Sequence, residues 1–260
     1  MPLYDAHCHW ADQRLAGHWK SIDADLRKIG LARAVVNGTS PGDWTPVLEL
    51  AKRDDRVLPA IGLHPWKVNH APANWRDRFL HALDHGARAI GEIGLDQWIE
   101  GHDIDRQLDA FHWQLQQAAE RDLPVSIHCL KATGPLMKAL KEAELPERGI
   151  HLHALNAPLE VFEQLAGLGA RFSFNAGQLK PKHKKAPEAI RAIPSERLLV
   201  ESDAPDFLPA EVQREFELPD ALNHPANLRA AYRAIADLRE TSVETLAEQV
   251  ARNFKRYFLE

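Results

Sequence analysis

The sequence has few cysteines, no long apolar run and no excess of basic residues. Its 260 residues include two cysteines, Cys8 and Cys129, so a disulfide-stabilised scaffold is excluded and we expect both thiols to be free. No apolar stretch approaches the ~18 residues of a membrane span, so we expect no membrane helix, no secretory signal and a cytoplasmic location. The formal net charge of -5 argues against general attraction to nucleic acid, so any such role requires a local site.

The composition is that of an ordinary globular protein. The chain is 45% hydrophobic and 27% charged, which is enough apolar material for a substantial core. The sequence contains no Gly/Ser linker and no break in composition, so we expect one domain spanning residues 1–260. No sequence feature indicates an obligate protein partner.

Short β-rich runs alternate with longer amphipathic segments along the whole chain. In residues 103–122, for example, apolar side chains recur at helical spacing. A later helix is expected to begin at Thr241, because Glu244 follows at the spacing of a capping box. Eight such strand–helix units predict an α/β protein, a single-domain (β/α)8 TIM barrel. The predicted strands are residues 3–9, 32–39, 57–64, 87–95, 124–129, 149–155, 170–176 and 198–204.

Six residues that can bind metal lie near the carboxyl ends of these strands, where a barrel places its active site. Two of them, His7 and His9, are two positions apart, so both side chains point to the same face of the first strand. Imidazoles and carboxylates together suit divalent ions such as zinc, magnesium or manganese. The predicted metal ligands are His7, His9, Glu92, His128, His153 and Asp203.

Glu92 interrupts a strand that otherwise belongs to the barrel core, IGEIGLD (90–96). A carboxylate in a packed interior costs several kcal/mol unless a positive group meets it. Two cations ~3.5–4 Å apart can share one carboxylate as a bridge. The sequence therefore predicts a centre of two divalent metal ions with Glu92 between them. His64 and His151 are weaker candidates, and His151 is expected one layer deeper in the barrel.

An ordered set of motifs carries a family resemblance. The motifs are DAHCH (5–9), GLHP (62–65), GEIGLD (91–96), PVSIHC (124–129), HLHA (151–154) and LLVESDAP (198–205), followed by NHPANL (223–228) and ARNFKRYF (251–258). Over nearly its whole length the chain resembles the TatD family of metal-dependent hydrolases, within the amidohydrolase-like barrels. The resemblance implies a TIM barrel, a divalent-metal centre at the six ligands above, and hydrolysis of DNA phosphodiester bonds by a metal-activated water, typically as a deoxyribonuclease. It places His64 at the substrate site.

Two positions near the expected substrate depart from the family pattern. Members commonly carry an arginine two residues after the fifth-strand histidine, whereas this chain has Leu130 there and Lys131 next. Lysine neutralises phosphate as a point charge but cannot form the planar two-bond grip of arginine. After the sixth strand, Asn156 and Ala157 replace a small hydroxyl and a glycine. We expect His64, Lys131 and Asn156 to contact the substrate.

Lysines and tryptophans are predicted on the same rim. Four lysines follow the seventh strand, where they form either a solvated face or a patch that attracts phosphate. They are Lys180, Lys182, Lys184 and Lys185. Trp10, Trp66 and Trp98 follow the first, third and fourth strands, where indoles either stack on bases or pack the loops.

Three functions are compatible with these residues. The preferred one is metal-assisted hydrolysis of DNA, in which Glu92 bridges the metals and Asp203 orients a water and accepts its proton. The alternative keeps the same centre and hydrolyses an amide, ester or lactone. The third is a non-catalytic metal-dependent binding protein, and the presence of Asp203 beside a full ligand set argues against it because binding alone needs no base.

Overall fold

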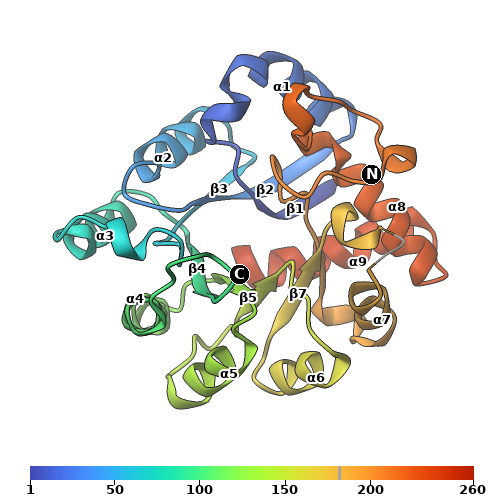
Figure 1. Ribbon diagram of the computed structural model, residues 1–260. Helices are drawn as coiled ribbons and strands as arrows, with labels where there is room; N and C mark the ends of the chain where they lie inside the picture. The colour runs from blue at the N-terminus through green and yellow to red at the C-terminus, as the bar shows by residue number, and fades with distance from the viewer. Residues whose placement is uncertain (181–182) are drawn as a thin grey trace.

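The computed structural model describes residues 1–180 and 183–260, and it shows eight parallel strands in a nearly closed barrel (Figure 1). Each strand pairs with the next in chain order, and all the ladders are parallel. Parallel neighbours require a crossover connection, which the intervening helices supply. The predicted α/β barrel is confirmed. The strands are β1 Leu3–Cys8, β2 Leu31–Gly38, β3 Val57–Ile61, β4 Ala89–Asp96, β5 Val125–Leu130, β6 His151–His153, β7 Arg171–Phe174 and β8 Leu198–Val200.

Helices surround the strands (Figure 1). Within the two described ranges, no helix combines the length and the apolar character needed to cross a bilayer. The α-helices are α1 Trp19–Lys28, α2 Trp44–Arg53, α3 Trp75–Asp84, α4 Ile104–Arg121, α5 Thr133–Glu142, α6 Leu159–Gly167, α7 Lys185–Ala192, α8 Leu228–Leu238 and α9 Val243–Phe254. The short 3-10 helices are η1 Gln13–His18, η2 Val68–His70, η3 Ala176–Leu179, η4 Ser195–Arg197, η5 Glu211–Gln213, η6 Pro219–Ala221 and η7 Pro225–Asn227, and a π-helix, η8 Lys255–Leu259, ends the chain.

The predicted strands agree with the observed ones to within a few residues, and β8 shows why the last one is shorter than expected. Its ladder with β7 ends at Val200, and the chain then turns toward β1. The backbone N–H of Asp203 donates to the carbonyl of His7 at 3.0 Å, and the N–H of His9 donates to Ala204 at 2.8 Å. These bonds join the last strand to the first and place Asp203 beside the histidines of β1.

The helix predicted over residues 103–122 is α4, and the side chain of Asp103 caps it by accepting from the N–H of Arg106. The capping box predicted at Thr241 is wrong. Thr241 still belongs to the turn that ends α8, because its N–H donates to the carbonyl of Ala236. The N-cap of α9 is the next residue, Ser242, whose hydroxyl accepts from the N–H of Thr245 at 3.0 Å.

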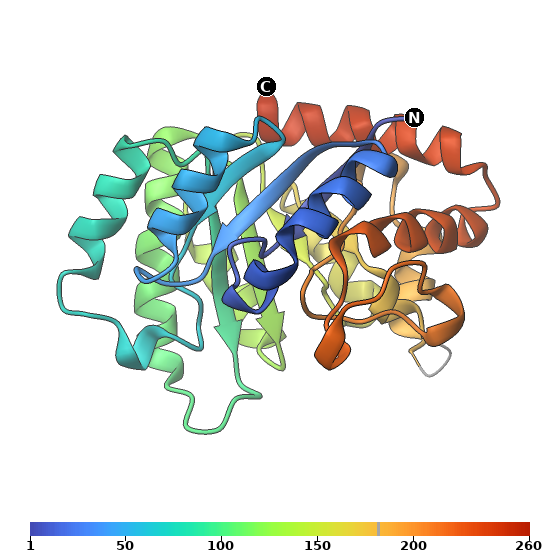
Figure 2. The same cartoon turned by 90° about the horizontal axis from the view of Figure 1, so that it is seen from above.

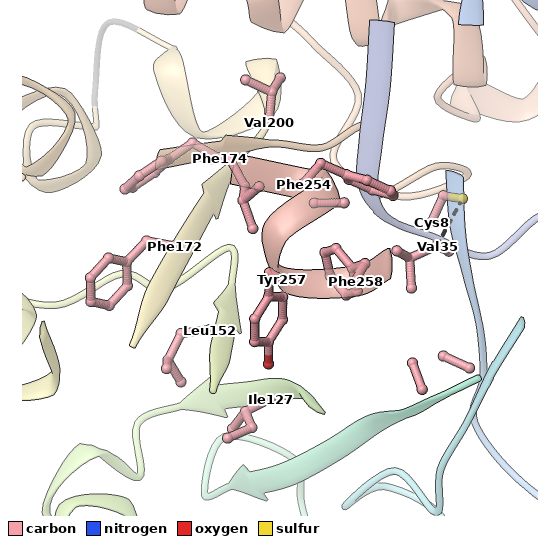
Figure 3. Packing of buried hydrophobic residues seen from close by; sticks show 14 of the residues in the cluster. Cys8, Val35, Ile127, Leu152, Phe172, Phe174, Val200, Phe254, Tyr257 and Phe258 are labelled. Atoms are coloured by element: carbon pink, nitrogen blue, oxygen red, sulfur yellow. Dashed lines mark hydrogen bonds between the residues drawn. The ribbon is translucent and has the colours of Figure 1, made fainter. Parts of the chain in front are cut away.

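The C-terminal helices close the amino-terminal end of the barrel. In Figure 2 the red α9 lies across the end from which the strand arrows point away. Asn253 donates to the carbonyl of Leu198 at the start of β8. The hydroxyl of Tyr257 donates to the carbonyl of Val125 and accepts from its N–H, both at 2.9 Å, and Figure 3 shows this ring pointing between β5 and β6. The opposite end, at the carboxyl ends of the strands, is left for the site.

Both cysteines are free thiols, as expected. Cys8 is fully buried and its Sγ donates to the carbonyl of Val35 (Figure 3). Burial raises the pKa of both thiols, to about 11 for Cys129. Neither thiol is therefore an activated nucleophile.

We expect Tyr257→Phe to destabilise the protein by about 1–3 kcal/mol, because it leaves the backbone N–H and carbonyl of Val125 without their buried partner. Urea unfolding of the variant and the parent measures the difference. Tyr4→Phe is the matched control, since the Tyr4 hydroxyl has no hydrogen-bond partner in the described part of the chain. Equal stabilities for Tyr257→Phe and the parent would contradict the role assigned to this hydroxyl.

Candidate metal centre

Glu92 lies at the floor of the open end of the barrel and is 3% exposed. Glycines let the neighbouring strands approach it closely. Gly94 adopts a φ of +145°, and a Cβ there would overlap the backbone of His128 in β5. A Cβ at Gly62, after β3, would overlap the backbone of Glu92 itself. The glycines of GLHP and GEIGLD thus bring three strand ends together around one carboxylate.

One oxygen of Glu92 faces the β1 histidines, which are His7 within the strand and His9 directly after it. Its Oε2 lies 3.5 Å from Nε2 of His7 and 3.3 Å from Nε2 of His9. The two imidazole nitrogens are themselves 3.2 Å apart, which confirms that the side chains share one face. Asp203 approaches the same pair, with Oδ1 at 3.9 Å from His7 and 3.6 Å from His9.

The other oxygen of Glu92 faces a separate group of imidazoles. Its Oε1 lies 2.7 Å from Nε2 of His153, 3.0 Å from Nδ1 of His128 and 3.2 Å from Nε2 of His64. The structure therefore brings the six predicted ligands together, and it adds His64 to the contacts of Glu92. The two carboxylate oxygens divide the imidazoles into two groups.

This donor set fits a divalent metal. Three groups of residues each place one ligand atom apiece within 4.8 Å of the others: His7, His153 and Asp203; His7, His9 and Glu92; and His64, Glu92 and His128. Nδ1 of His153 is buried and has no hydrogen-bond partner among the described residues, while Asp203 Oδ2 lies 3.8 Å away. Imidazole with carboxylate is a donor combination that zinc and manganese accept. The stoichiometry of two ions and their identity remain predictions.

Hydrogen bonds orient the β1 histidines toward Glu92. Nδ1 of His7 pairs with the hydroxyl of Ser126 at 2.7 Å and with the amide of Asn37 at 3.2 Å. Nδ1 of His9 donates to the carbonyl of Asn37 at 3.1 Å. With Nδ1 engaged on each ring, Nε2 is turned into the site, as metal-binding histidines require.

Two more carboxylates are buried beneath the centre. Asp5 accepts from the N–H and the hydroxyl of Ser202, at 2.9 and 2.5 Å. Glu201 accepts from Ser173, and the same hydroxyl contacts Nε2 of His151 at 2.6 Å. Burial raises the pKa of Asp5 to about 7 and that of Glu201 to about 8. His151 belongs to this deeper layer, as the sequence indicates.

In the metal-free chain, the surroundings raise the pKa of two imidazoles of the centre. Burial alone would lower the pKa of His9, but its hydrogen bond to Glu92 and the charges of Glu92 and Asp203 raise it to about 10. His128 is similarly raised to about 9 by Asp96 and Glu92, against the effect of burial. Burial opposes the charge of Glu92, yet the imidazoles around it hold the pKa of this carboxyl well below its ordinary value. Burial raises the pKa of Asp203 to about 7.

A cavity of about 640 Å³ opens above the centre, and it receives two of the three predicted substrate residues. His64 and Asn156 line it. Lys131 does not: it is exposed, its backbone has a φ of +52°, and Leu130 lines the cavity instead. The side chain of Lys131 therefore does not line the site.

The rim residues separate into those that line the cavity and those that do not. Trp66, Trp98 and Phe207 line the cavity, and they are 42%, 56% and 45% exposed. Trp10 is 3% exposed and packs against Trp19, so of its two predicted alternatives loop packing is the observed one.

Among the predicted lysines, Lys180 lines the cavity, whereas Lys184 and Lys185 lie outside its lining. Lys182 lies outside the described residues. Lys67, after β3, also lines the cavity and was not predicted. The lysines that line the cavity therefore come from two separate loops, and Arg14 adds a third cationic side chain to the lining.

Asp96 is a buried site residue that the sequence motifs were not used to predict. It is fully buried, and it accepts hydrogen bonds from Nε2 of His128 at 2.8 Å and from the indole of Trp66 at 2.7 Å. A signal was available, because Asp96 follows Glu92 by four residues on β4 and an even spacing places both on one face.

Comparisons with known proteins agree with this geometry. Residues 4–259 match a family model described as TatD related DNase. YcfH of Escherichia coli strain K12, described as an uncharacterized metal-dependent hydrolase, is 31% identical over 263 residues, covering 99% of this chain and 96% of the relative. The 3'-5' ssDNA/RNA exonuclease TatD of Erwinia tasmaniensis is 29% identical, covering 98% and 99%. The crystal structure of YjjV, a TatD homologue from Escherichia coli K12, matches with a TM-score of 0.90 at 25% identity, covering 98% of this chain and 97% of that one.

We expect zinc binding to the metal-free chain at pH 7 to release protons. The pKa values of His9 and His128, about 10 and about 9, are raised, so both imidazoles hold a proton below those values and must lose it to bind metal. The apparent affinity should therefore rise with pH, about tenfold per pH unit for each proton released. Calorimetric titration in buffers of different ionisation enthalpy measures the number of protons.

Two variants sharpen this measurement. His128→Gln should reduce the proton count by about one, because that imidazole is no longer displaced from its proton. His85→Gln, at the exposed C-cap of α3, should leave the count unchanged. A binding heat that does not depend on the buffer would refute the proton arrangement described above.

Proposed function

The chain belongs to the TatD related DNase family of metal-dependent hydrolases, and from that premise we propose that it hydrolyses phosphodiester bonds in DNA. The observation that carries the proposal is the position of Glu92, whose two oxygens face two groups of imidazoles. A relative that covers nearly the whole chain is named a 3'-5' ssDNA/RNA exonuclease, which supports nucleic acid as the substrate. A single domain over residues 1–260 and a cytoplasmic location are part of the proposal.

The six predicted ligands would hold two divalent cations, and Glu92 would face both of the groups of imidazoles that surround it. The ligands are His7, His9, Glu92, His128, His153 and Asp203. When bound, such cations supply Lewis acidity, lowering the pKa of water and polarising the scissile group.

Asp203 is the general base of the proposal. Its Oδ1 faces the β1 histidines and its Oδ2 faces His153, so it borders both groups of ligands. Burial raises its pKa in the metal-free chain to about 7, which is the range in which a carboxylate accepts a proton effectively at neutral pH. Asp203 therefore orients the attacking water and takes its proton.

His64 supplies a hydrogen-bond donor to the substrate. Its Nδ1 accepts from the backbone N–H of Trp66 at 3.1 Å, so in the neutral ring the proton is on Nε2. Burial lowers its pKa to about 4, which keeps the ring neutral at pH 7. The Nε2–H faces Oε1 of Glu92 at 3.2 Å at the floor of the cavity, so a phosphoryl oxygen that accepts it would take the place of this contact.

The cavity walls suit an unpaired strand. Trp66, Trp98 and Phe207 present exposed aromatic surface on which bases can stack. Lys67 and Lys180 supply positive charge for phosphates. Because Glu92 and Asp203 are each 3% exposed at the floor of a recess, the scissile bond has to enter it, which favours a flexible single strand or a chain end over the middle of a duplex.

Parallel assays test the proposal. Protein stripped of metal and then supplied with zinc, manganese or magnesium is assayed on single-stranded DNA, duplex DNA, and small amides, esters and lactones. The proposal predicts metal-dependent cleavage of the single strand. Turnover of an amide, ester or lactone alone would favour the second enzyme class, and binding without turnover would favour a non-catalytic protein.

Asp203→Asn should reduce kcat by ~10²-fold or more while the remaining ligands still hold metal, because the amide keeps an oxygen but cannot accept the proton. Turnover, metal content and thermal midpoint are measured on the same preparation. His64→Ala is the comparison, and it should mainly raise KM. If Asp203→Asn turns over like the parent with full metal, Asp203 is not the base.

Replacing Lys67 and Lys180 together by glutamine should raise KM for DNA. The slope of log kcat/KM against log salt concentration should become shallower by about 0.7 for each phosphate contact that is lost. The matched control is the double replacement of Lys184 and Lys185, which lie outside the cavity lining. The slope of kcat/KM against salt concentration distinguishes the two. An unchanged slope in the Lys67 and Lys180 variant would remove both lysines from the substrate path.

A further inference from the structure

We propose that Asp96 is a positioning residue that fixes which nitrogen of His128 binds metal and couples that ligand to the aromatic wall of the cavity. Asp96 ends β4 and its side chain is fully buried. It lies between the metal centre on one side and the two loops that carry Trp66 and Trp98 on the other. The inference rests on the proposed metal centre and is independent of the substrate.

The carboxylate of Asp96 receives four donors. Its Oδ2 accepts from Nε2 of His128 at 2.8 Å and from the indole N–H of Trp66 at 2.7 Å. Its Oδ1 accepts from the backbone N–H groups of Trp98 at 2.7 Å and Ile99 at 3.1 Å. Both oxygens are therefore fully used, and the side chain cannot rotate without breaking bonds to two loops.

The contact with Asp96 determines the chemistry of His128. A carboxylate oxygen only accepts, so Nε2 of His128 has to carry the proton. Nδ1 is then the nitrogen left for a metal, and it lies 3.0 Å from Oε1 of Glu92. A carboxylate behind a metal-binding histidine fixes the ring and strengthens the ligand, and losing such a partner typically costs about 10–100-fold in metal affinity.

Gln107 of α4 holds the backbone of Asp96 in place. Its Oε1 accepts from the N–H of Asp96 at 2.8 Å, and its Nε2 donates to the carbonyl of Asp96 at 2.9 Å. Gln107 is 1% exposed, although it lies on a helix that packs on the outside of the barrel. The position of the carboxylate is thus set from behind as well as from the site.

Only a carboxylate satisfies this arrangement. The amide of Asp96→Asn can take two orientations. If its oxygen faces His128 and Trp66, its NH₂ group faces the backbone N–H donors of Trp98 and Ile99. The reversed amide puts the NH₂ group against the indole and drives the His128 proton to Nδ1, where it blocks metal. Either orientation leaves buried donors unpaired.

Zinc affinity of Asp96→Asn, measured by competition with a chromophoric chelator, should fall about 10–100-fold relative to the parent. Asp54→Asn is the matched control: the same charge is removed from a carboxylate that pairs with Arg56 before β3, and zinc affinity should not change. Equal affinities for Asp96→Asn and the parent would overturn the inference alone. A parent that binds no zinc would overturn the proposed metal centre and this inference with it.

A second measurement uses the zinc-loaded parent, so it does not depend on the folding of a variant. Nitrogen-15 NMR of the histidine rings should show His128 protonated at Nε2 and bound to zinc through Nδ1. Zinc should also shift the indole N–H signal of Trp66, assigned with Trp66→Phe, more than that of Trp113, which packs with Trp75 away from the site. Zinc bound to Nε2 of His128, or an unshifted Trp66 signal, would contradict the coupling.

Discussion

A carboxylate buried in the floor of a barrel has to be compensated, and the open end of this protein is organised around that requirement at Glu92. Removing a carboxylate from water costs several kcal/mol, even after the surrounding protein relaxes. Among the described residues, the groups that contact the carboxylate of Glu92 include no lysine or arginine. Imidazoles from separate strand ends surround it instead. Imidazoles can exchange a proton for a metal ion at neutral pH, which a guanidinium cannot. Because imidazoles rather than guanidinium groups surround Glu92, the site can bind a metal ion.

The amino-terminal end of the barrel contributes stability, whereas the carboxyl ends of the strands form the site. The motif ARNFKRYF contributes no group to the centre, and its Asn253 and Tyr257 instead fasten the C-terminal helices to strand starts. The motif NHPANL is also structural, yet it acts on the site. Asn223 donates to the carbonyl of Ser202 and to that of Pro205, on both sides of Asp203. A motif without catalytic chemistry thus holds the proposed base in position.

Strand and helix periodicity predicted the barrel because the pattern repeats eight times, and an error of one or two residues in a boundary changes little. The grouping of the six candidate ligands was predictable for a related reason: parallel strands bring their carboxyl ends to one rim. Loop residues lack this constraint. Lys131 follows a strand directly, but its side chain lies outside the cavity lining. Asp96 itself lies on β4, whereas its partners Trp66 and Trp98 lie on two loops that no periodicity relates.

Charge provides a last link between the centre and its proposed substrate. Arg14 at the cavity wall is already paired with Asp12 and Asp206, so it adds little attraction for a phosphate. In the metal-free chain, the raised pKa values of His9 and His128 place protons at the floor. If two divalent cations bind as proposed, exchanging two protons for them would raise the charge of the floor by two, at the depth where a scissile phosphate would lie. On the proposed function, metal binding would therefore also strengthen the attraction of a polyanion to the floor of the cavity.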